Sequence, residues 1–327
     1  MRNNLKQKWE YVKAHALGLD DTFQFGCKRC GKCCKHREDI LISAFDLYRI
    51  GKYLLRTPAE VIERYCEAYL GSSSHVFVVR TKPTPPDDTC PFQCGKKCSI
   101  HQAKPLICAM YPLGRAYSSD QEGPIYFLRP EINCGKMDQT TTVRQWIGEF
   151  AEHEAEIAGK RWSDTIGVIS AACLKAWSNL NPGQREKLED AQQELLYLSY
   201  DVEQPFLPQF EANIAKLMLL IIKEVGTDIV PTWLPIPDSM SLEDKAALLV
   251  RKSYWMYLFD WCKCRGFDPM DQDDKTEEFP DGCTYACFGE FQYTEYRDAY
   301  YMKQLLNQED YELWDKIQKQ ERNKQHG

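Results

Sequence analysis

Four cysteines within eight residues constrain this chain more than any other feature of its sequence. Cys27, Cys30, Cys33 and Cys34 follow the pattern Cys-x2-Cys-x2-Cys-Cys, and Gly31 lies inside it. Thiolates that are separated by two residues across a turn can reach one metal centre, and a glycine lets the backbone turn without a side-chain clash. Adjacent Cys33 and Cys34 would be strained as ligands of the same ion, so one of them can serve a second site or a bridge. The motif predicts a metal-binding loop.

The 15 cysteines of the 327-residue chain are clustered rather than scattered. Ten lie between Cys27 and Cys134, four lie between Cys262 and Cys287, and only Cys173 lies between these two clusters. The N-terminus lacks the apolar segment of a signal peptide, and the longest apolar run, 217–222, is far shorter than the roughly 20 residues that span a bilayer. We therefore expect a cytoplasmic protein with no membrane partner, in which clustered cysteines bind metal or act in catalysis rather than form disulfides.

Charge and motifs exclude several other classes of function. The net charge of −7 argues against nucleic acid as a partner. The sequence has no Gly-x-Gly and no Gly-Lys-Ser/Thr, so it lacks the dinucleotide fingerprint and the P-loop. The first cysteine motif is locally basic, which offsets thiolate charge and lowers the pKa of a thiol. Its five cations are Lys28, Arg29, Lys32, Lys35 and Arg37.

Capping signals and helical periodicity predict a mainly α fold. Thr57-Pro58-Ala59-Glu60 is a capping box that predicts a helix to about Leu70, and Ser43 can cap a helix to about Leu55. Further helices are expected over 1–18, 142–180, 184–200, 208–225, 241–264 and 291–325, with short strands at 75–81 and 125–129. We expect an irregular cysteine-rich metal-binding domain with short strands over 1–138, followed by a helical domain over 139–327.

A second set of cysteines extends the first motif. Cys90, Cys94 and Cys98 are spaced by three residues, Cys108 lies between Pro105 and Pro112, and Cys134 follows later. Together with the first motif, these residues resemble the YkgJ-type cysteine cluster family, which carries a zinc- or iron-chelating CxxCxxCC domain. The family's block CxI(Y/H)xxRPxxCRxFP is matched here with Lys104, Ala109 and Tyr111 in place of Arg, Arg and Phe. The resemblance covers about residues 23–136.

The resemblance implies a metal centre built from eight cysteines. They are Cys27, Cys30, Cys33, Cys34, Cys90, Cys98, Cys108 and Cys134. Eight thiolates suffice for two zinc ions, two iron–sulfur clusters, or one of each, and the sequence does not divide them between centres. Cys66, Cys94 and Cys173 are expected to lie outside this set, and His101 is a weaker candidate ligand.

Three functions follow from this interpretation. The first is a metal-binding protein with zinc or an iron–sulfur cluster as its cofactor. The second, implied because the family includes proteins resembling flagellin lysine N-methylases, is a protein-modifying enzyme with a protein substrate. The third is a structural zinc scaffold for a protein partner. The sequence assigns no catalytic residue and no oligomeric state.

Two further cysteine pairs suggest a second metal site. Cys262 and Cys264 are separated by one residue, and Cys283 and Cys287 by three. Two close pairs joined by a loop are the layout of a zinc site, although Cys-x2-Cys is the commoner spacing. The alternatives are thiols packed among aromatic side chains, or thiols that complete the first centre.

Overall fold

The computed structural model describes residues 2–35, 40–117, 123–130, 132, 134–148 and 153–227, with shorter stretches between 230 and 251 and between 308 and 319. The chain divides into two compact units, residues 1–177 with 181–213 and residues 178–180 with 214–327. The domain boundary predicted between residues 138 and 139 stays a prediction. The predicted second metal site at Cys262, Cys264, Cys283 and Cys287 lies outside the described residues.

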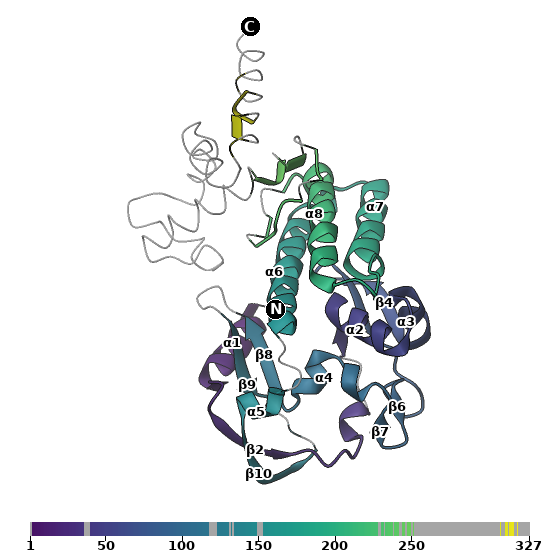
Figure 1. Cartoon of the computed structure of the whole chain (residues 1–327), viewed down its shortest axis with the longest axis vertical. Helices are drawn as coiled ribbons and strands as arrows, with labels where there is room; N and C mark the ends of the chain where they lie inside the picture. The colour runs from purple at the N-terminus through teal and green to yellow at the C-terminus, as the bar shows by residue number, and fades with distance from the viewer. Residues whose placement is uncertain are drawn as a thin grey trace, which may run out of the picture. The chain divides into compact units, whose positions relative to one another are not determined.

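Helices make up much of the described chain (Figure 1). They are α1 (Arg2–Ala14), α2 (Ala44–Leu54), α3 (Pro58–Tyr65), α4 (Leu106–Met110), α5 (Val143–Ile147), α6 (His153–Ala176), α7 (Pro182–Gln193) and α8 (Phe206–Val225). Shorter helical turns are η1 (Lys32–Cys34), η2 (His101–Ala103), η4 (Trp177–Asn179) and η5 (Glu194–Leu198). Among the described residues, we find no helix with the length and hydropathy to cross a membrane.

Helices α2 and α3 begin where the capping residues predict. The hydroxyl of Ser43 accepts a hydrogen bond from the Asp46 amide at 3.2 Å, and the Asp46 carboxylate accepts one from the Ser43 amide at 3.2 Å. Thr57 and Glu60 form the same reciprocal capping box at the start of α3. Helix α3 ends at Tyr65, before the predicted end at Leu70, because residues 66–70 pair as a strand instead.

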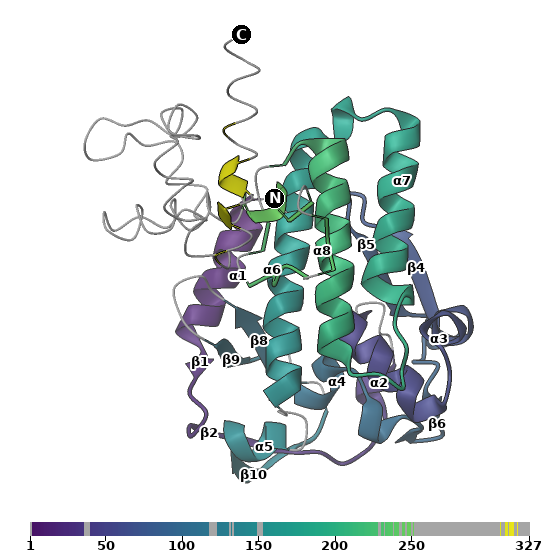
Figure 2. The same cartoon turned by 45° about the horizontal axis from the view of Figure 1, so that its top comes forward.

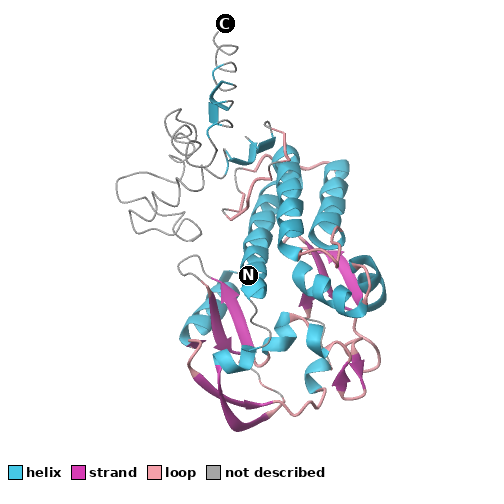
Figure 3. Cartoon of the chain, viewed as in Figure 1, coloured by secondary structure: helices cyan, strands magenta, loops and turns pink. Residues whose placement is uncertain are grey.

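Small antiparallel sheets account for too much of the chain for a mainly α fold, so that prediction is wrong. The strands are β1 (Ala16–Leu17), β2 (Thr22–Gly26), β3 (Leu41–Ile42), β4 (Cys66–Leu70), β5 (Phe77–Thr81), β6 (Gln93–Cys94), β7 (Lys97–Cys98), β8 (Leu113–Tyr117), β9 (Pro124–Leu128) and β10 (Lys136–Thr142). They form sheets in the orders β1-β9-β8, β10-β2, β3-β5-β4 and β6-β7, drawn magenta in Figure 3. The fold is therefore mixed α and β. Several strands have only two residues, too few for the alternation of polar and apolar residues that reveals a strand in a sequence.

The β3-β5-β4 sheet is held against α7 by polar contacts to its middle strand. Figure 2 shows α7 beside β4 and β5. The Gln192 side chain of α7 accepts a hydrogen bond from the Phe77 amide at 2.9 Å and donates one to the His75 carbonyl at 3.3 Å. Gln192 is fully buried, so these bonds satisfy both ends of its amide group. They fix the sheet that carries Thr81, which is close to the cysteines described below.

The β2-β10 ribbon joins two parts of the chain that are more than 100 residues apart. Thr22 pairs with Thr142, and Gly26 pairs with Lys136. Phe25 on β2 is 1% exposed, and its ring lies edge-on to Trp146, with 5.2 Å between the ring centroids. This ribbon brings the residues just before Cys27 next to those just after Cys134.

Candidate metal centre

Thiols from separate segments surround one cavity of about 360 Å³, which we call the thiol pocket. Six of the eight predicted ligands line it: Cys27, Cys33, Cys34, Cys90, Cys98 and Cys108. The other two, Cys30 and Cys134, do not line the cavity. Among the described residues, none of the eleven cysteines is joined in a disulfide.

The loop that holds the first four cysteines needs a glycine to lie close to strand β6. Gly31 has a φ of 72°, and its carbonyl accepts a hydrogen bond from the Cys34 amide at 3.1 Å. A Cβ at position 31 would lie 2.5 Å from Nε2 of Gln93, so a larger residue would push the loop away from strand β6. The sulfur of Cys27 accepts a hydrogen bond from the Arg29 amide at 3.4 Å. Gly31 therefore lets the loop turn and lie against the second group of cysteines.

Cys90 and Cys98 are placed by a backbone contact and by a hairpin. The Cys90 amide donates a hydrogen bond to the Cys34 carbonyl at 2.7 Å, which joins the two cysteine motifs directly. In the β6-β7 hairpin, Cys98 pairs with Gln93, and Cys94 pairs with Lys97. Neighbouring pairs of a hairpin present their side chains to opposite faces, and Cys98 lines the thiol pocket whereas Cys94 is exposed.

Cys108 is carried by α4, whose first turn is anchored by a buried carboxylate. Oδ1 of Asp46 accepts a hydrogen bond from the Leu106 amide at 2.8 Å, and Asp46 is 5% exposed. Because the first amides of a helix have no partner within the helix, this bond also satisfies a buried donor. The Cys108 amide donates to the Pro105 carbonyl at 2.9 Å. Asp46 thus ties the start of α2 to the short helix that holds Cys108.

Cys134 is brought near the first loop by the β2-β10 ribbon. It lies two residues before Lys136, which pairs with Gly26. Between them, Gly135 has a φ of 87°, and a Cβ there would overlap the ring of Phe25. A glycine is therefore required beside Cys134.

Several of the eight thiols lie close enough to shift one another's pKa. A hydrogen bond that the Cys34 thiol donates to Cys33, burial, and the charges of Cys33, Cys90 and Cys108 raise the pKa of Cys34. Burial raises the pKa of Cys134, and the charges of Cys33, Cys30 and Cys27 raise it further.

Burial also raises the pKa of Cys98, with a further contribution from Cys33, while Lys104 opposes the shift. Each of the eight predicted ligands therefore interacts electrostatically with at least one other. A bound cation would reverse these shifts, because it favours the thiolate form.

Cations line the thiol pocket, and no aspartate or glutamate is among its described lining residues. The cations are Arg29, Lys96, Lys97 and Lys104. Of the five cations predicted around the first motif, Arg29 lines the pocket, whereas Lys35 forms an ion pair with Asp87 at 2.6 Å. Three of the four described cations that line the pocket, Lys96, Lys97 and Lys104, therefore belong to the second group of cysteines rather than to the first motif.

The thiols of this pocket are suitable ligands for a soft or borderline metal, although their side chains do not converge on one point. Thiolates are the preferred ligands of zinc and of iron–sulfur clusters. Within the described residues, no three Cys, His, Asp or Glu side chains are arranged to hold one ion.

Sequence reasoning missed one neighbour of the predicted ligands. Cys66 was predicted to lie within a helix, but it is the first residue of β4 and pairs with Thr81, which lines the thiol pocket. Burial, with a contribution from Cys90, raises the pKa of the Cys66 thiol to about 12. The start of β4 depends on pairing with β5, so no local pattern could have placed Cys66 beside Cys90.

Comparison with protein families agrees with this geometry. Residues 26–138 match the CxxCxxCC family model, described as "Putative zinc- or iron-chelating domain". The CxxCxxCC domain is thus confirmed. The match contains all eight predicted ligands and covers about a third of the chain. It also supports the prediction that the metal is zinc or iron, while the YkgJ label stays a prediction. No curated protein and no solved structure matches the chain.

Proposed function

We propose that the CxxCxxCC domain binds zinc or an iron–sulfur cluster through the eight cysteines of its two motifs. One observation supports this most strongly: thiols from four separate segments form one electrostatic network around the thiol pocket. Packed structural cysteines would be buried singly, as Cys173 is, without effect on one another's pKa. A cytoplasmic, reducing environment belongs to the proposal because it keeps these ligands as thiols.

The adjacent cysteines Cys33 and Cys34 divide the ligands into two groups. Cys34 interacts with Cys90 and Cys108, and its carbonyl accepts the Cys90 amide. Cys33 instead interacts with Cys134 and Cys98, and Cys134 also feels the charges of the first two cysteines of the loop. We assign Cys34, Cys90 and Cys108 to one centre and Cys27, Cys30, Cys33 and Cys134 to the other. Cys98 interacts with Cys33 but belongs to the same motif as Cys90, so these contacts assign it to neither centre alone.

The test is the metal content and the absorption spectrum of the full chain purified under anaerobic conditions. We expect at least one metal per chain; an iron–sulfur cluster would show visible charge-transfer bands, whereas a zinc–thiolate site would be colourless. Cys30→Ser and Cys108→Ser should each lower the metal content. Cys173→Ala is the matched control, because that thiol is buried away from the pocket. Less than one metal per chain would refute the proposal.

A further inference from the structure

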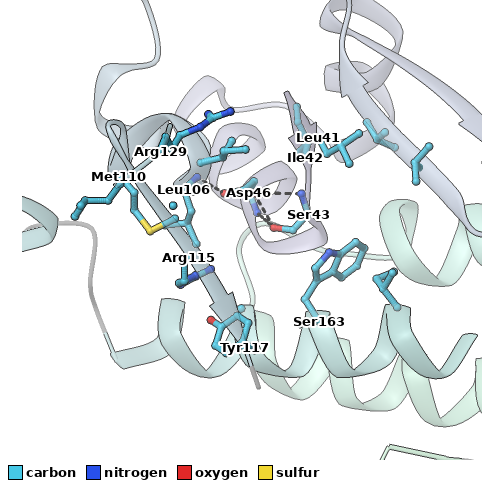
Figure 4. Close-up of a pocket in the computed structure, with 18 of the residues that line it drawn as sticks. Leu41, Ile42, Ser43, Asp46, Leu106, Met110, Arg115, Tyr117, Arg129 and Ser163 are labelled. Atoms are coloured by element: carbon cyan, nitrogen blue, oxygen red, sulfur yellow. Dashed lines mark hydrogen bonds between the residues drawn. The ribbon is translucent and has the colours of Figure 1, made fainter. Parts of the chain in front are cut away.

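A second cavity, of about 560 Å³, is lined by residues of α4, the helix that also contributes to the thiol pocket (Figure 4). Leu106 and Met110 line this cavity, Cys108 lines the thiol pocket, and Ile107 lines both. We call the new cavity the α4 pocket. Its volume is in the range of sites that bind small organic molecules, roughly 300–1,000 Å³. All of its lining residues belong to the first compact unit.

The walls of the α4 pocket are largely apolar. Leu41 comes from β3, Val79 from β5, and Trp162 and Ile166 from α6. Side chains of this kind can cover the apolar body of a ligand, but they cannot bind a small inorganic ion. The walls therefore favour an organic ligand.

Arg115 and Tyr117 form a polar end of this pocket, side by side on β8 (Figure 4). The Arg115 guanidinium lies 5.1 Å from the centre of the Tyr117 ring. Other arginines of the described chain form ion pairs with carboxylates, but Arg115 is in none of these pairs. The Tyr117 hydroxyl is buried and has no hydrogen-bond partner among the described residues. Both groups thus retain donors for a ligand.

Gly159 on α6 leaves the space in which these two donors converge. A Cβ at position 159 would lie 2.5 Å from a terminal nitrogen of Arg115 and 2.6 Å from the Tyr117 hydroxyl. The two polar groups therefore meet over one turn of α6. Burial raises the pKa of Tyr117 to about 12, so its hydroxyl keeps its proton at neutral pH and can donate. A guanidinium next to a hydroxyl donor is a favourable arrangement for a carboxylate.

The acidic side chains near the α4 pocket do not neutralise this polar end. Asp46 lines the pocket, but its carboxylate accepts hydrogen bonds from the Ser43 amide and hydroxyl and from the Leu106 amide. Asp164 is paired with Lys160 at 2.6 Å, and Glu156, which also affects the pKa of Tyr117, does not line the pocket.

A second arginine adds to the positive charge of the pocket. Arg129 also lines the pocket, so its described lining holds two cations, Arg115 and Arg129, and one acid, Asp46. The net charge of the lining is therefore positive, which favours an anionic ligand.

We propose that the α4 pocket binds a small organic carboxylate, with its apolar body against the walls and its carboxylate at Arg115 and Tyr117. The cavity, the apolar lining, the unpaired guanidinium and the buried hydroxyl without a partner all support this ligand class. The proposal does not depend on the metal of the neighbouring centre. It gives the chain a small-molecule site that shares a helix with the thiol pocket.

The test is calorimetric titration of the full chain with three acids of different shape (phenylacetate, 4-phenylbutyrate and octanoate) and with the amide of each. We expect at least one acid to bind saturably at millimolar concentration, and roughly tenfold or more tighter than its amide, because hydrogen bonds to a charged group are the stronger kind. This comparison needs no variant. If no acid binds, or if each amide binds as tightly as its acid, the proposal is wrong.

Substitutions then locate the carboxylate. Arg115→Gln should weaken binding of the acid roughly tenfold and leave the amide unchanged, and Tyr117→Phe should have a smaller effect of the same sign. Arg144→Gln is the matched control, because the Arg144 guanidinium is exposed and paired with Asp20 at 2.9 Å. Arg115→Lys, which keeps the charge, serves if Arg115→Gln does not fold. An acid that binds the Arg115 variants as tightly as the native chain would place the site elsewhere and refute the proposal.

Discussion

Replacement of Asp46 by alanine tests how much one buried carboxylate stabilises the helices beside the thiol pocket. Asp46 accepts the Ser43 amide at 3.2 Å, the Ser43 hydroxyl at 2.8 Å and the Leu106 amide at 2.8 Å. Loss of the α2 capping box costs about 1 kcal/mol. Loss of a charged acceptor from a buried amide costs about 1.5–3 kcal/mol. We therefore expect Asp46→Ala to lower the free energy of unfolding by about 2.5–4 kcal/mol.

The assay is urea unfolding of the full chain, followed by circular dichroism. Glu60→Ala is the matched control: Glu60 closes the same kind of capping box on α3, but its carboxylate is exposed, and beyond Thr57 it forms a surface ion pair with Arg56 at 3.8 Å. Glu60→Ala should lower the free energy of unfolding clearly less than Asp46→Ala does. Asp46→Asn, which retains an acceptor for Leu106, should fall between the two. If Asp46→Ala lowers the free energy of unfolding by less than about 1 kcal/mol, the reasoning is refuted, because removal of a buried acceptor with three partners should destabilise the fold by more than that.

Three further changes test other parts of the structure. Gly135→Ala forces a side chain onto a φ of 87° and into the ring of Phe25, so urea unfolding should show a loss of at least about 1 kcal/mol. Burial raises the pKa of Cys173 to about 11 from an ordinary value of 9.0. The protonated thiol therefore contributes its full stabilisation below pH 9, and this stabilisation is lost as the pH rises towards 11. The free energy of unfolding of Cys173→Ala should depend less on pH over that interval than that of the native chain. An equal pH dependence would contradict this prediction. Cys98→Ser should lower the metal content, whereas Cys94→Ser should not, and equal losses would show that the hairpin faces are wrongly assigned.

Local signals in the sequence predict where helices begin better than where they end. Ser43 and Thr57 cap α2 and α3 as expected, because a capping box is decided by residues within one turn. The end of α3 is decided instead by the pairing of Cys66 with Thr81, 15 positions further along the chain. The same holds for β2, whose partner β10 lies more than 100 residues away. The mainly α prediction failed because such pairing leaves little trace in a short window of sequence.

The cysteine spacing predicts which thiols gather, but not the residues that hold them. Asp46 belongs to an ordinary capping box in the sequence, and nothing there indicates its bond to Leu106, 60 residues away. The Tyr111 side chain is hydrogen-bonded to Cys134, which lowers the thiol pKa against the effect of burial. These partners depend on the tertiary fold, so they could be identified only when the structure placed α2, α4 and the β2-β10 ribbon.

The second motif shows why equal spacing along a chain does not mean equal roles. Cys90, Cys94 and Cys98 are each four positions apart, which would place them on one face of a helix. Here the last two belong to a hairpin in which Cys94 pairs with Lys97 and Cys98 pairs with Gln93. These neighbouring pairs face opposite sides of the hairpin, so only one of the two cysteines can point into the thiol pocket. The hairpin, whose turn includes Gly95 with a φ of 61°, therefore places Cys98 and not Cys94 in the lining of the thiol pocket.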